Sequence, residues 1–409
     1  MRRLPFAVAF WDGSVLPAGE TPSIGTVRVR RRAIAHLLHE PNQLGLVRAF
    51  VLGDLDLDGD IEALLALRGR FRGVEMSHRD VALGLAGALL LGGRGALRPP
   101  RAPASELRAE GHRHSLRRDR TVVQHHYDVS NAFYRRLLGP TLVYSCAYFE
   151  SPDDSLEAAQ ERKLELICRK LRLQPGERLL DVGCGWGSLL LHAAERHGVR
   201  GVGITLSEEQ AALARERVRD AGLQDRIEIR VADYREVDDG PYDKIASVGM
   251  VEHVGLAQLD TYAATLARLL RPGGLLLNHG IAQLFSQPAG EKSLIQRYVF
   301  PDGELPQLGV VIGALQSAGL EPRDVESLRE HYALTLRRWL ANLTTERDGI
   351  VAEVGEERER VWRLYMLGSA LAFEDDDISI FQVLATRPGA AHELPLVRAQ
   401  AVEPAADAL

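Results

Sequence analysis

Cysteine is scarce in this chain: its 409 residues include three, Cys146, Cys168 and Cys184. The number is odd and no two of them form a C-x-x-C pair, which argues against both a disulfide framework and a structural zinc site. The acidic run Glu374–Asp377 does not indicate a metal either, because consecutive acids point in alternate directions and usually form a solvated loop or helix start. We therefore expect no metal, and a reducing compartment, the cytoplasm.

The net charge is also small, and the chain has no long hydrophobic run. The formal net charge is -6, so no overall field favours a nucleic acid as partner. The longest uncharged apolar run, Val81 to Gly93, would span about 20 Å as a helix against a hydrocarbon core of roughly 30 Å, so it cannot cross a bilayer. Residues Met1 to Trp11 contain only a short apolar run, broken by Asp12, which makes a poor signal peptide. A globular protein of about two to three domains is expected.

Residues 1–93 mix short strand-like runs with helical patterns. The runs Ile24–Arg30 and Leu44–Leu52 indicate strands, whereas Ile61–Leu67 and Val81–Leu91 indicate helices. We predict a small N-terminal α+β domain over this segment.

Residues 94–120 are rich in arginine, histidine, proline and alanine and have few acids, which is typical of a linker. Two interpretations stay open: a solvated basic connector, or a patch that meets anionic lipid headgroups, at about 1 kcal/mol for each basic residue near the surface. The segment contains no aromatic residue, and nucleic-acid binding would favour aromatics interleaved with the basic residues. Its arginines are Arg94, Arg98, Arg101, Arg108, Arg113, Arg117, Arg118 and Arg120.

From Arg178 onward strand-like and helical segments alternate, which implies a parallel sheet with helices on both faces. Ligands of such sheets bind beyond the carboxyl ends of the strands. We predict an α/β catalytic domain over residues 121–390, with a mostly parallel, doubly wound, Rossmann-like sheet, and a disordered tail over residues 391–409. The expected strands are Arg178–Val182, Val199–Thr205, Ile227–Ala232, Tyr242–Val248 and Leu275–His279, with helices at Ser188–His197 and from Ser207.

The first of these strands runs into a glycine turn, Leu179 to Gly187, that reads LLDVGCGWG. Glycine is needed where the backbone takes positive φ or approaches a ligand closely, and the helix behind the turn offers unpaired N–H groups and a positive dipole end. A dinucleotide fingerprint reads G-x-G-x-x-G, whereas this turn reads G-x-G-x-G after Asp181. The pattern favours an adenosine-type cofactor, with a simple tight turn as the alternative.

The next strand ends fit a methyl donor better than a hydride carrier. Thr205 and Leu206 stand where an Asp or Glu usually holds the ribose hydroxyls, which is a departure from the common pattern. Asp233 and Tyr234 suit an adenine amine and a ring face, although Asp233 fits a turn former equally well.

Ser207 and Gln210 form an S-x-x-Q pattern, which predicts a capped helix start. Capping alone explains Ser207, whereas Gln210 would still reach the cofactor from the first turn of the helix.

Motifs in one fixed order make a family resemblance specific. They are HYDVSN at His126–Asn131, YSCAYF at Tyr144–Phe149, LDVGCGWG at Leu180–Gly187, ITLS at Ile204–Ser207, EHVG at Glu252–Gly255 and YVFPDG at Tyr298–Gly303. Together they resemble the cyclopropane fatty acid synthase family, which includes the mycolic acid cyclopropane synthases, over residues 120–388. Residues before 94 resemble, more weakly, the N-terminal lipid-engaging domain of the bacterial phospholipid enzymes in that family.

The resemblance implies a class I methyltransferase fold that uses S-adenosylmethionine to add a methylene to the cis double bond of an unsaturated phospholipid acyl chain. The attack leaves a carbocation, which calls for aromatic faces and for no nearby nucleophile. Tyr127, Phe300 and Tyr332 match family aromatics in that role. The residues that the resemblance and the strand ends assign to the cofactor are Tyr144, Ser145, Asp181, Gly183, Gly185, Trp186, Gly187, Thr205, Leu206, Gln210, Asp233 and Tyr234.

The resemblance also implies a bound bicarbonate, the base that removes a proton from the new methyl group. Its ligands in the family correspond to the Cys146 backbone, Glu252, His279, the Ile281 backbone and Tyr332. A carboxylate beside bicarbonate would repel it, so either the glutamate or the histidine is expected to supply the proton that holds the anion.

One position departs from the family pattern: Ser369 stands where many members carry a cysteine in a late helix, which bears on substrate positioning more than on chemistry. Two alternatives to a ring-forming synthase stay open. One is a C-methyltransferase that lets hydride shift and forms a 10-methylene acyl chain. The other is a non-catalytic lipid-binding protein that has kept the fold.

The resemblance implies unsaturated phospholipids as partners and a peripheral position at the inner face of the membrane. We expect Val81–Leu91 and the arginine linker, aided by the loop Gln283–Gln296, to dock on anionic bilayers. No nucleic-acid partner is expected, and a homodimer is left open.

Overall fold

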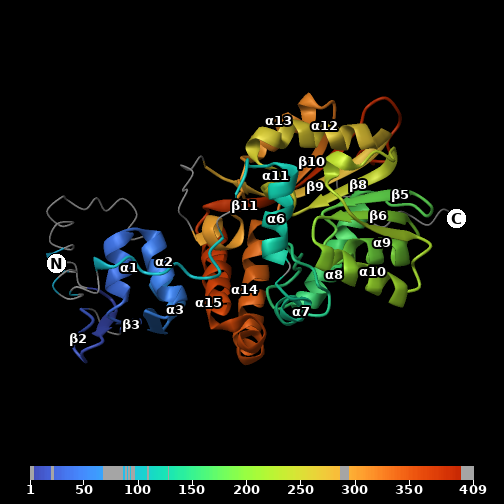
Figure 1. Ribbon diagram of the computed structural model, residues 1–409. Helices are drawn as coiled ribbons and strands as arrows, with labels where there is room; N and C mark the ends of the chain where they lie inside the picture. Colours follow the sequence, from blue (N-terminus) through green and yellow to red (C-terminus); the bar gives the residue numbers. More distant parts are fainter. Residues whose placement is uncertain are drawn as a thin grey trace. The chain divides into compact units, whose positions relative to one another are not determined.

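The computed structural model describes residues 4–19, 23–67, 86–87, 90, 93, 97–107, 110–127, 129–285 and 294–397 (Figure 1). Most of the predicted helix Val81–Leu91, part of the loop Gln283–Gln296 and the end of the tail 391–409 lie outside these residues. The chain forms two compact units. The first comprises Met1–Arg108, Gly290–Val299 and Val354–Leu371, and the second comprises Ala109–Ala289, Phe300–Glu353 and Ala372–Leu409.

The first unit holds a four-stranded sheet in the order β2-β1-β3-β4. β1 and β3 are parallel, while β1–β2 and β3–β4 are antiparallel pairs, so helices and a mixed sheet share the unit. Its strands are β1 (Ala7–Phe10), β2 (Val15–Leu16), β3 (Gly25–Val29) and β4 (Leu55–Gly59), and its N-terminal helices are α1 (Ala33–His39), α2 (Gln43–Val51) and α3 (Ile61–Ala66).

The prediction of a strand at Leu44–Leu52 is wrong, because this segment forms helix α2. Asn42 caps the helix: its side-chain oxygen accepts hydrogen bonds from the backbone N–H groups of Leu44, at 2.9 Å, and Gly45, at 3.3 Å. A short apolar run fits a buried strand or a buried helix equally well, and here the cap favours the helix.

The second unit is built on a seven-stranded sheet in the order β10-β11-β9-β8-β5-β6-β7. The five strands from β9 to β7 are parallel. β11 pairs antiparallel with β9, and β10 pairs antiparallel with β11. This confirms the predicted α/β fold with a mostly parallel sheet. Its strands are β5 (Arg178–Val182), β6 (Arg200–Thr205), β7 (Ile227–Val231), β8 (Tyr242–Val248), β9 (Leu270–Gln283), β10 (Glu321–Ser327) and β11 (Ile378–Thr386).

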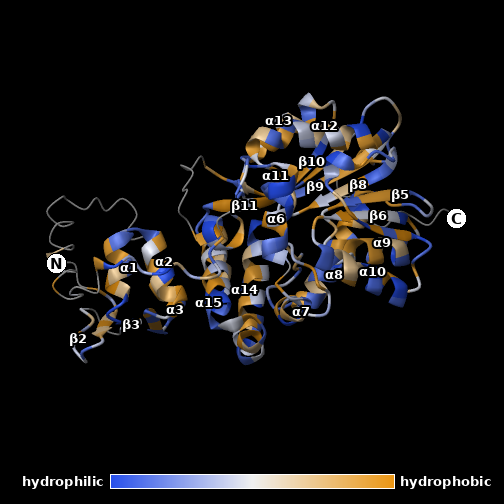
Figure 2. Ribbon diagram, viewed as in Figure 1, coloured by the Kyte–Doolittle hydropathy of each residue, from blue (hydrophilic) through white to orange (hydrophobic). Residues whose placement is uncertain are grey.

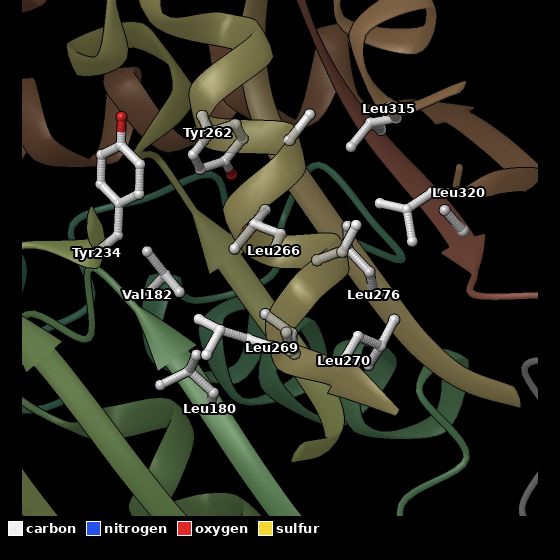
Figure 3. Close-up of a cluster of buried hydrophobic side chains, with 14 of the residues drawn as sticks. Leu180, Val182, Tyr234, Tyr262, Leu266, Leu269, Leu270, Leu276, Leu315 and Leu320 are labelled. Atoms are coloured by element: carbon white, nitrogen blue, oxygen red, sulfur yellow. The ribbon is translucent and has the colours of Figure 1, made fainter. Parts of the chain in front are cut away.

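Helices lie on both faces of this sheet. Because successive residues of a strand point to opposite faces, one strand contributes side chains to the core on each face. On β5, Leu179 packs with α8 and α9 in one core, whereas Leu180 packs with α12 in the other. Figure 3 shows the second core, in which Leu180 and Val182 of β5 lie beside Leu269 and Leu266 of α12. In Figure 2 the central strands are mostly hydrophobic, whereas α10 carries both hydrophobic and hydrophilic residues.

The helices of the second unit follow the predicted pattern closely around the glycine turn, and α9 has the predicted bounds. None of the helices in the described part of the chain is both long and apolar enough to cross a membrane. The helices are α6 (Leu116–Tyr127), α7 (Asn131–Leu138), α8 (Leu156–Lys170), α9 (Ser188–His197), α10 (Glu208–Asp220), α11 (Val251–Val254), α12 (Leu259–Leu269), α13 (Leu308–Ser317), α14 (Arg329–Thr345) and α15 (Arg347–Glu374), the last interrupted at Gly355 and divided between the two units.

Strand β9 is longer than the predicted Leu275–His279. It continues to Gln283 because β11 pairs with it in antiparallel register from Leu275 to that residue. The pairing places Gln382 of β11 opposite His279 and Ile380 opposite Ile281. A partner strand that arrives a hundred residues later in the chain leaves no local signal for the extension.

Candidate active site

A pocket lies at the carboxyl ends of β5, β6 and β8 in the second unit, where open parallel sheets bind ligands. Among the predicted cofactor-binding residues, those that line it are Tyr144, Ser145, Asp181, Gly183, Gly185, Trp186, Thr205, Leu206, Gln210, Asp233 and Tyr234. Gly187 is not part of the lining. It is instead the residue that precedes α9, with a φ of 78°.

The glycine turn after β5 bends sharply into the pocket wall. Gly183 and Gly185 both have positive φ, 82° and 54°, which favours glycine. A Cβ atom on Gly183 would lie 3.1 Å from Cγ of Met250. The backbone N–H groups of Gly183 and Cys184 both donate to the carbonyl of Ile204, at 3.0 and 2.9 Å, so the turn is tied to the end of β6.

Two buried charged groups lie in the wall at the start of this turn. Burial raises the pKa of Asp181 to about 7, although the positive charge of Lys163 acts in the opposite direction. Burial has the opposite effect on a base and lowers the pKa of Lys163 to about 8. The Lys163 ammonium donates a hydrogen bond of 2.9 Å to Oγ of Ser145, which also lines the pocket.

Sequence reasoning missed Lys163, which lies in a charged run that looks like a solvent face. The signal that would have found it is helical spacing, because the buried face of α8 includes Leu156, Ala159, Lys163 and Lys170. Lysines at these positions are buried with the apolar residues rather than solvated.

The end of β6 is organised by hydrogen bonds within its own loop. The Thr205 hydroxyl donates to Oε1 of Gln210 at 2.7 Å, and the Ser207 hydroxyl accepts from the Gln210 backbone N–H at 3.1 Å. The predicted capping role of Ser207 is therefore confirmed. Thr205 and Gln210 both line the pocket, with Gln210 held in place by the same cap.

The sequence analysis left two interpretations of Asp233 open, a turn former and a residue of the cofactor site. Asp233 caps the short helical turn Tyr234–Glu236 and it lines the pocket. Its carboxylate also accepts two hydrogen bonds of 2.7 Å from the guanidinium of Arg235, which in turn donates to Asp119 of α6 at 2.7 Å. A chain of charges therefore connects the end of β7 to α6.

Helix α6 forms part of the pocket wall through Asp119, Val122, Val123 and Tyr127. The helix begins at Leu116, inside the segment that the sequence analysis assigned to a linker. Its Arg118 donates to both carboxylate oxygens of the buried Asp302, at 2.6 and 2.7 Å. Neither interpretation of the basic segment fits Arg118, since an arginine paired in this way is neither a free solvated charge nor open to lipid.

Glu252 meets Ile281 at the ends of β8 and β9, and His279 lies two residues before Ile281 on the same face of β9. The Ile281 backbone N–H donates to Oε1 of Glu252 at 2.7 Å. Both Oε2 of Glu252 and Nε2 of His279 are buried, and neither has a hydrogen-bond partner among the described residues. Burial raises the pKa of Glu252 to about 7 and lowers that of His279 well below its usual value. Two buried polar atoms without partners are costly unless a ligand meets them.

This cluster adjoins the cofactor pocket, although its three residues are not among those that line it. The N–H group of Gly249 donates to the carbonyl of His279 at 2.8 Å, and Gly249 lines the pocket. His253, next to Glu252 in the chain, also lines the pocket, and burial lowers its pKa to about 4.

Aromatic rings from separate elements gather beside these residues. Tyr127 lines the pocket, and its ring centroid lies 4.7 Å from that of His126 and 6.1 Å from that of Tyr144. Phe300 packs on His126 and His253, with centroids 4.3 and 4.9 Å apart. The sequence analysis chose the tyrosine and phenylalanine but not the two histidines, whose burial is set by tertiary packing.

The remaining predicted catalytic residues are placed as follows. Cys146 is fully buried, and burial raises its pKa far above the usual thiol range. The ring of Tyr332 packs against Trp339 and Phe373, with centroids 6.0 and 4.8 Å away. Ser369 lies on α15 in the first unit.

Cys168, His192 and His197 form a cluster whose potential metal-ligating atoms lie within 4.8 Å of one another. The sequence analysis expected no metal, and that expectation stays a prediction. Oε2 of Glu165 lies 3.0 Å from Nε2 of both imidazoles, so hydrogen bonds to Glu165 of α8 account for the positions of the two histidines of α9.

Comparisons with known proteins match this architecture. A model of the family described as mycolic acid cyclopropane synthetase matches residues 114–383. A probable fatty acid methyltransferase of Pseudomonas putida is 41% identical over 402 residues, which cover 97% of this chain and 95% of that protein. The cyclopropane-fatty-acyl-phospholipid synthase of Escherichia coli (strain K12) is 38% identical over 277 residues, which cover 67% of this chain and 69% of that protein.

A solved structure adds the cofactor class. The mycolic acid cyclopropane synthase CmaA1, complexed with SAH and CTAB, matches with a TM-score of 0.63 and 35% identity, over 66% of this chain and 98% of that chain. The family model and these relatives show that the chain belongs to the mycolic acid cyclopropane synthetase family, a lipid-modifying group of S-adenosylmethionine-dependent methyltransferases.

Proposed function

We propose that the protein is a cyclopropane-fatty-acyl-phospholipid synthase. The observation that carries the proposal is the buried cluster beside the pocket, in which Glu252 Oε2 and His279 Nε2 have no partner among the described residues while Glu252 Oε1 holds the Ile281 N–H. A protein that only bound lipid would gain nothing from this arrangement, which costs stability.

The pocket fits S-adenosylmethionine, which supplies an electrophilic methyl group on a sulfonium. Asp233 and Gln210 offer polar groups from the ends of β7 and β6, and Gly183 leaves the wall open where a side chain would meet Met250. Lys163 holds the Ser145 hydroxyl in a fixed position. Because an alkene is a weak nucleophile, exact placement of the donor supplies much of the rate.

The Glu252 cluster fits a small anion, and we propose bicarbonate, which would accept the proton lost as the ring closes. A carboxyl group with a pKa of about 7 is half protonated at pH 7 and mostly protonated below it, and protonated Glu252 would donate a hydrogen bond to the anion rather than repel it. The Ile281 N–H orients that carboxyl group, and His279 and Tyr332 would complete the ligand set with the Cys146 backbone.

The surroundings suit a carbocation because they offer π faces and few nucleophiles. Tyr127 and Phe300 present rings, and the nearby His253 and His126 have pKa values lowered by burial, so they add no positive charge. The Cys146 thiol has a raised pKa and stays protonated, which keeps it from trapping the cation.

For the substrate, we propose unsaturated phospholipids at an anionic membrane surface, with the N-terminal unit helping to extract the acyl chain. A second candidate is a fatty acyl C-methyltransferase that forms a 10-methylene chain. It is favoured by the relative in Pseudomonas putida, a probable fatty acid methyltransferase that matches this chain over nearly its full length.

The experiment incubates the purified protein with oleoyl-phospholipid vesicles, bicarbonate and S-adenosylmethionine, and measures the acyl chains by mass spectrometry before and after ozone treatment. A gain of one methylene that resists ozone supports ring formation. The same gain with ozone sensitivity assigns the protein to the methylene-forming class, and no gain in any anionic lipid mixture favours a binding protein.

A further inference from the structure

The ring of His279 is held from behind by a buried amide. Gln382 lies directly opposite His279 in the antiparallel pairing of β9 and β11, and its Nε2 is 2.9 Å from Nδ1 of the imidazole. Both side chains are almost fully buried. The contact alone does not fix which ring nitrogen carries the proton, because an amide offers an acceptor and a donor at similar positions.

Lys170 fixes the orientation of that amide. Its ammonium donates to Oε1 of Gln382 at 2.8 Å, and it is itself paired with Glu326. An ammonium has only donors, so the amide oxygen must face Lys170 and the amide NH₂ must face His279. Nδ1 of His279 therefore accepts a hydrogen bond, and the neutral ring carries its hydrogen on Nε2, the atom without a partner among the described residues.

We infer that Lys170 and Gln382 are positioning residues that hold His279 as the Nε2–H tautomer, so that it donates a hydrogen bond to the anion bound beside Glu252. The inference rests on the proposed function. It assigns His279 the role of a hydrogen-bond donor to the anion, since its Nε2 carries a hydrogen and accepts no further proton while the ring stays neutral. Burial and the charges of Lys163 and Lys170 favour that neutral ring.

If Gln382 had only a structural role, its substitutions would have different effects. Gln382→Glu preserves the shape of the side chain and gives Lys170 a charged partner, so a purely structural role would tolerate it better than Gln382→Met. A carboxylate, however, accepts from Nδ1–H and would reverse the tautomer, leaving a lone pair on Nε2 toward the anion. If the inference is right, Gln382→Glu is the more damaging change, whereas Gln382→Met only releases the ring.

The experiment uses the full chain and two readouts. The first is the ¹⁵N NMR spectrum of histidine-labelled protein, in which the His279 signal is identified by its loss in His279→Gln. We expect an Nε2–H signature in the wild type and an Nδ1–H signature in Gln382→Glu. The second is turnover against bicarbonate concentration, for which we expect the half-saturating concentration to rise on the order of ten- to a hundredfold in Gln382→Glu, less in Gln382→Met, with the KM for S-adenosylmethionine unchanged.

The exposed Gln316 on α13 provides the matched control, since Gln316→Glu makes the same chemical change away from the site. An unchanged tautomer and unchanged bicarbonate dependence in Gln382→Glu would overturn the inference. If wild-type turnover does not depend on bicarbonate, the proposed anion site fails, and the role of His279 as its ligand fails with it. In that case a tautomer reversal in Gln382→Glu would still show that the relay fixes the ring, so the two failures are distinguishable.

Discussion

Among single residues, Glu252 has a buried carboxyl group of which one oxygen accepts from the Ile281 N–H and the other has no partner in the described chain. Its pKa of about 7 lies above the value near 4.5 of an unburied glutamate. Between these two values the folded state binds more protons than the unfolded state, so the contribution of Glu252 to the free energy of unfolding falls as pH rises. The loss amounts to about 3 kcal/mol and is complete above the folded pKa.

Glu252→Gln removes this titration while keeping an oxygen that accepts from the Ile281 N–H. We expect the variant to gain stability relative to wild type as pH rises from 5 to 8, by up to about 3 kcal/mol in urea unfolding. Glu216→Gln serves as control, because it makes the same chemical change at an exposed position. An equal offset for Glu252→Gln at both pH values would contradict the raised pKa.

The same variant should lose activity although it gains stability at high pH. An amide N–H is a weaker donor to the anion than a carboxyl O–H, so turnover is expected to fall on the order of tenfold, about the 1 to 1.5 kcal/mol of one hydrogen bond. Binding of S-adenosylhomocysteine, measured by calorimetry, should stay near the wild-type value because Glu252 is not among the residues that line the pocket. A variant with normal turnover would remove Glu252 from the mechanism.

Among secondary-structure elements, α6 is tied to the rest of the pocket wall by two ion pairs, Arg118–Asp302 and Asp119–Arg235, of which the first is the more buried. Arg118 is 14% exposed and Asp302 5%, and two hydrogen bonds join them. Breaking a buried pair typically costs about 3 to 5 kcal/mol. The cost is smaller here, because Arg113 also donates to Asp302, at 3.4 Å, and keeps that carboxylate partly paired.

Arg118→Met should therefore loosen α6 and weaken binding of S-adenosylhomocysteine by at least about tenfold in calorimetry, which corresponds to roughly 1.4 kcal/mol. Arg117→Met on the same helix is the control, because Arg117 is exposed and has no ion pair among the described residues. Equal affinity in the two variants would show that α6 is held by other contacts.

Some elements could be predicted from sequence patterns alone, and others could not. β5, α9 and β8 were predicted because each has its own local signal: alternating or continuous apolar residues, and a glycine turn that precedes a helix. The continuation of β9 and the placement of Gln382 opposite His279 were not predictable, because strand pairing with β11 joins residues far apart in the chain. The burial of Lys163 was not predicted for a related reason, since it depends on the sheet against which α8 packs.

The candidate site divides in the same way. The residues expected to bind the cofactor came from strand ends and, for Tyr144 and Ser145, from the family resemblance, and most of them line one pocket. The residues proposed to bind the anion came from the family resemblance alone. The protonation of Glu252 and the tautomer of His279 are set by burial and by partners such as Gln382, which no local pattern reveals.

At the scale of the whole molecule, the first unit is assembled from segments separated in sequence. Glu357 accepts hydrogen bonds from the Ser105 backbone, at 2.7 Å, and hydroxyl, at 2.6 Å, and the Leu107 N–H donates to the carbonyl of Arg297 at 3.0 Å. Deleting residues 1–120 would leave these later segments without their partners. The deletion would also remove Asp119 from the pocket wall, so this truncation is a poor test of membrane docking.

Point variants of α6 test the docking proposal without unfolding either unit. Arg117 and Arg120 are exposed and belong to the basic segment, whereas Arg118 is paired internally. If these two arginines meet anionic headgroups, Arg117→Gln/Arg120→Gln should lose about 2 kcal/mol of binding to vesicles containing phosphatidylglycerol, roughly thirtyfold in flotation assays. The loss should shrink as salt is added, because screening weakens the attraction in the wild type.

The exposed pair Arg200 and Arg219 gives a control with the same change in net charge, Arg200→Gln/Arg219→Gln. Because electrostatic attraction to a surface falls off within about 10 Å at moderate salt, only charges near the docking face should matter. Equal losses in the two double variants would mean that net charge alone governs binding, and no loss in either would assign docking to apolar contacts or to other parts of the chain. A loss confined to Arg117→Gln/Arg120→Gln would place the start of α6, and with it one wall of the cofactor pocket, at the lipid surface.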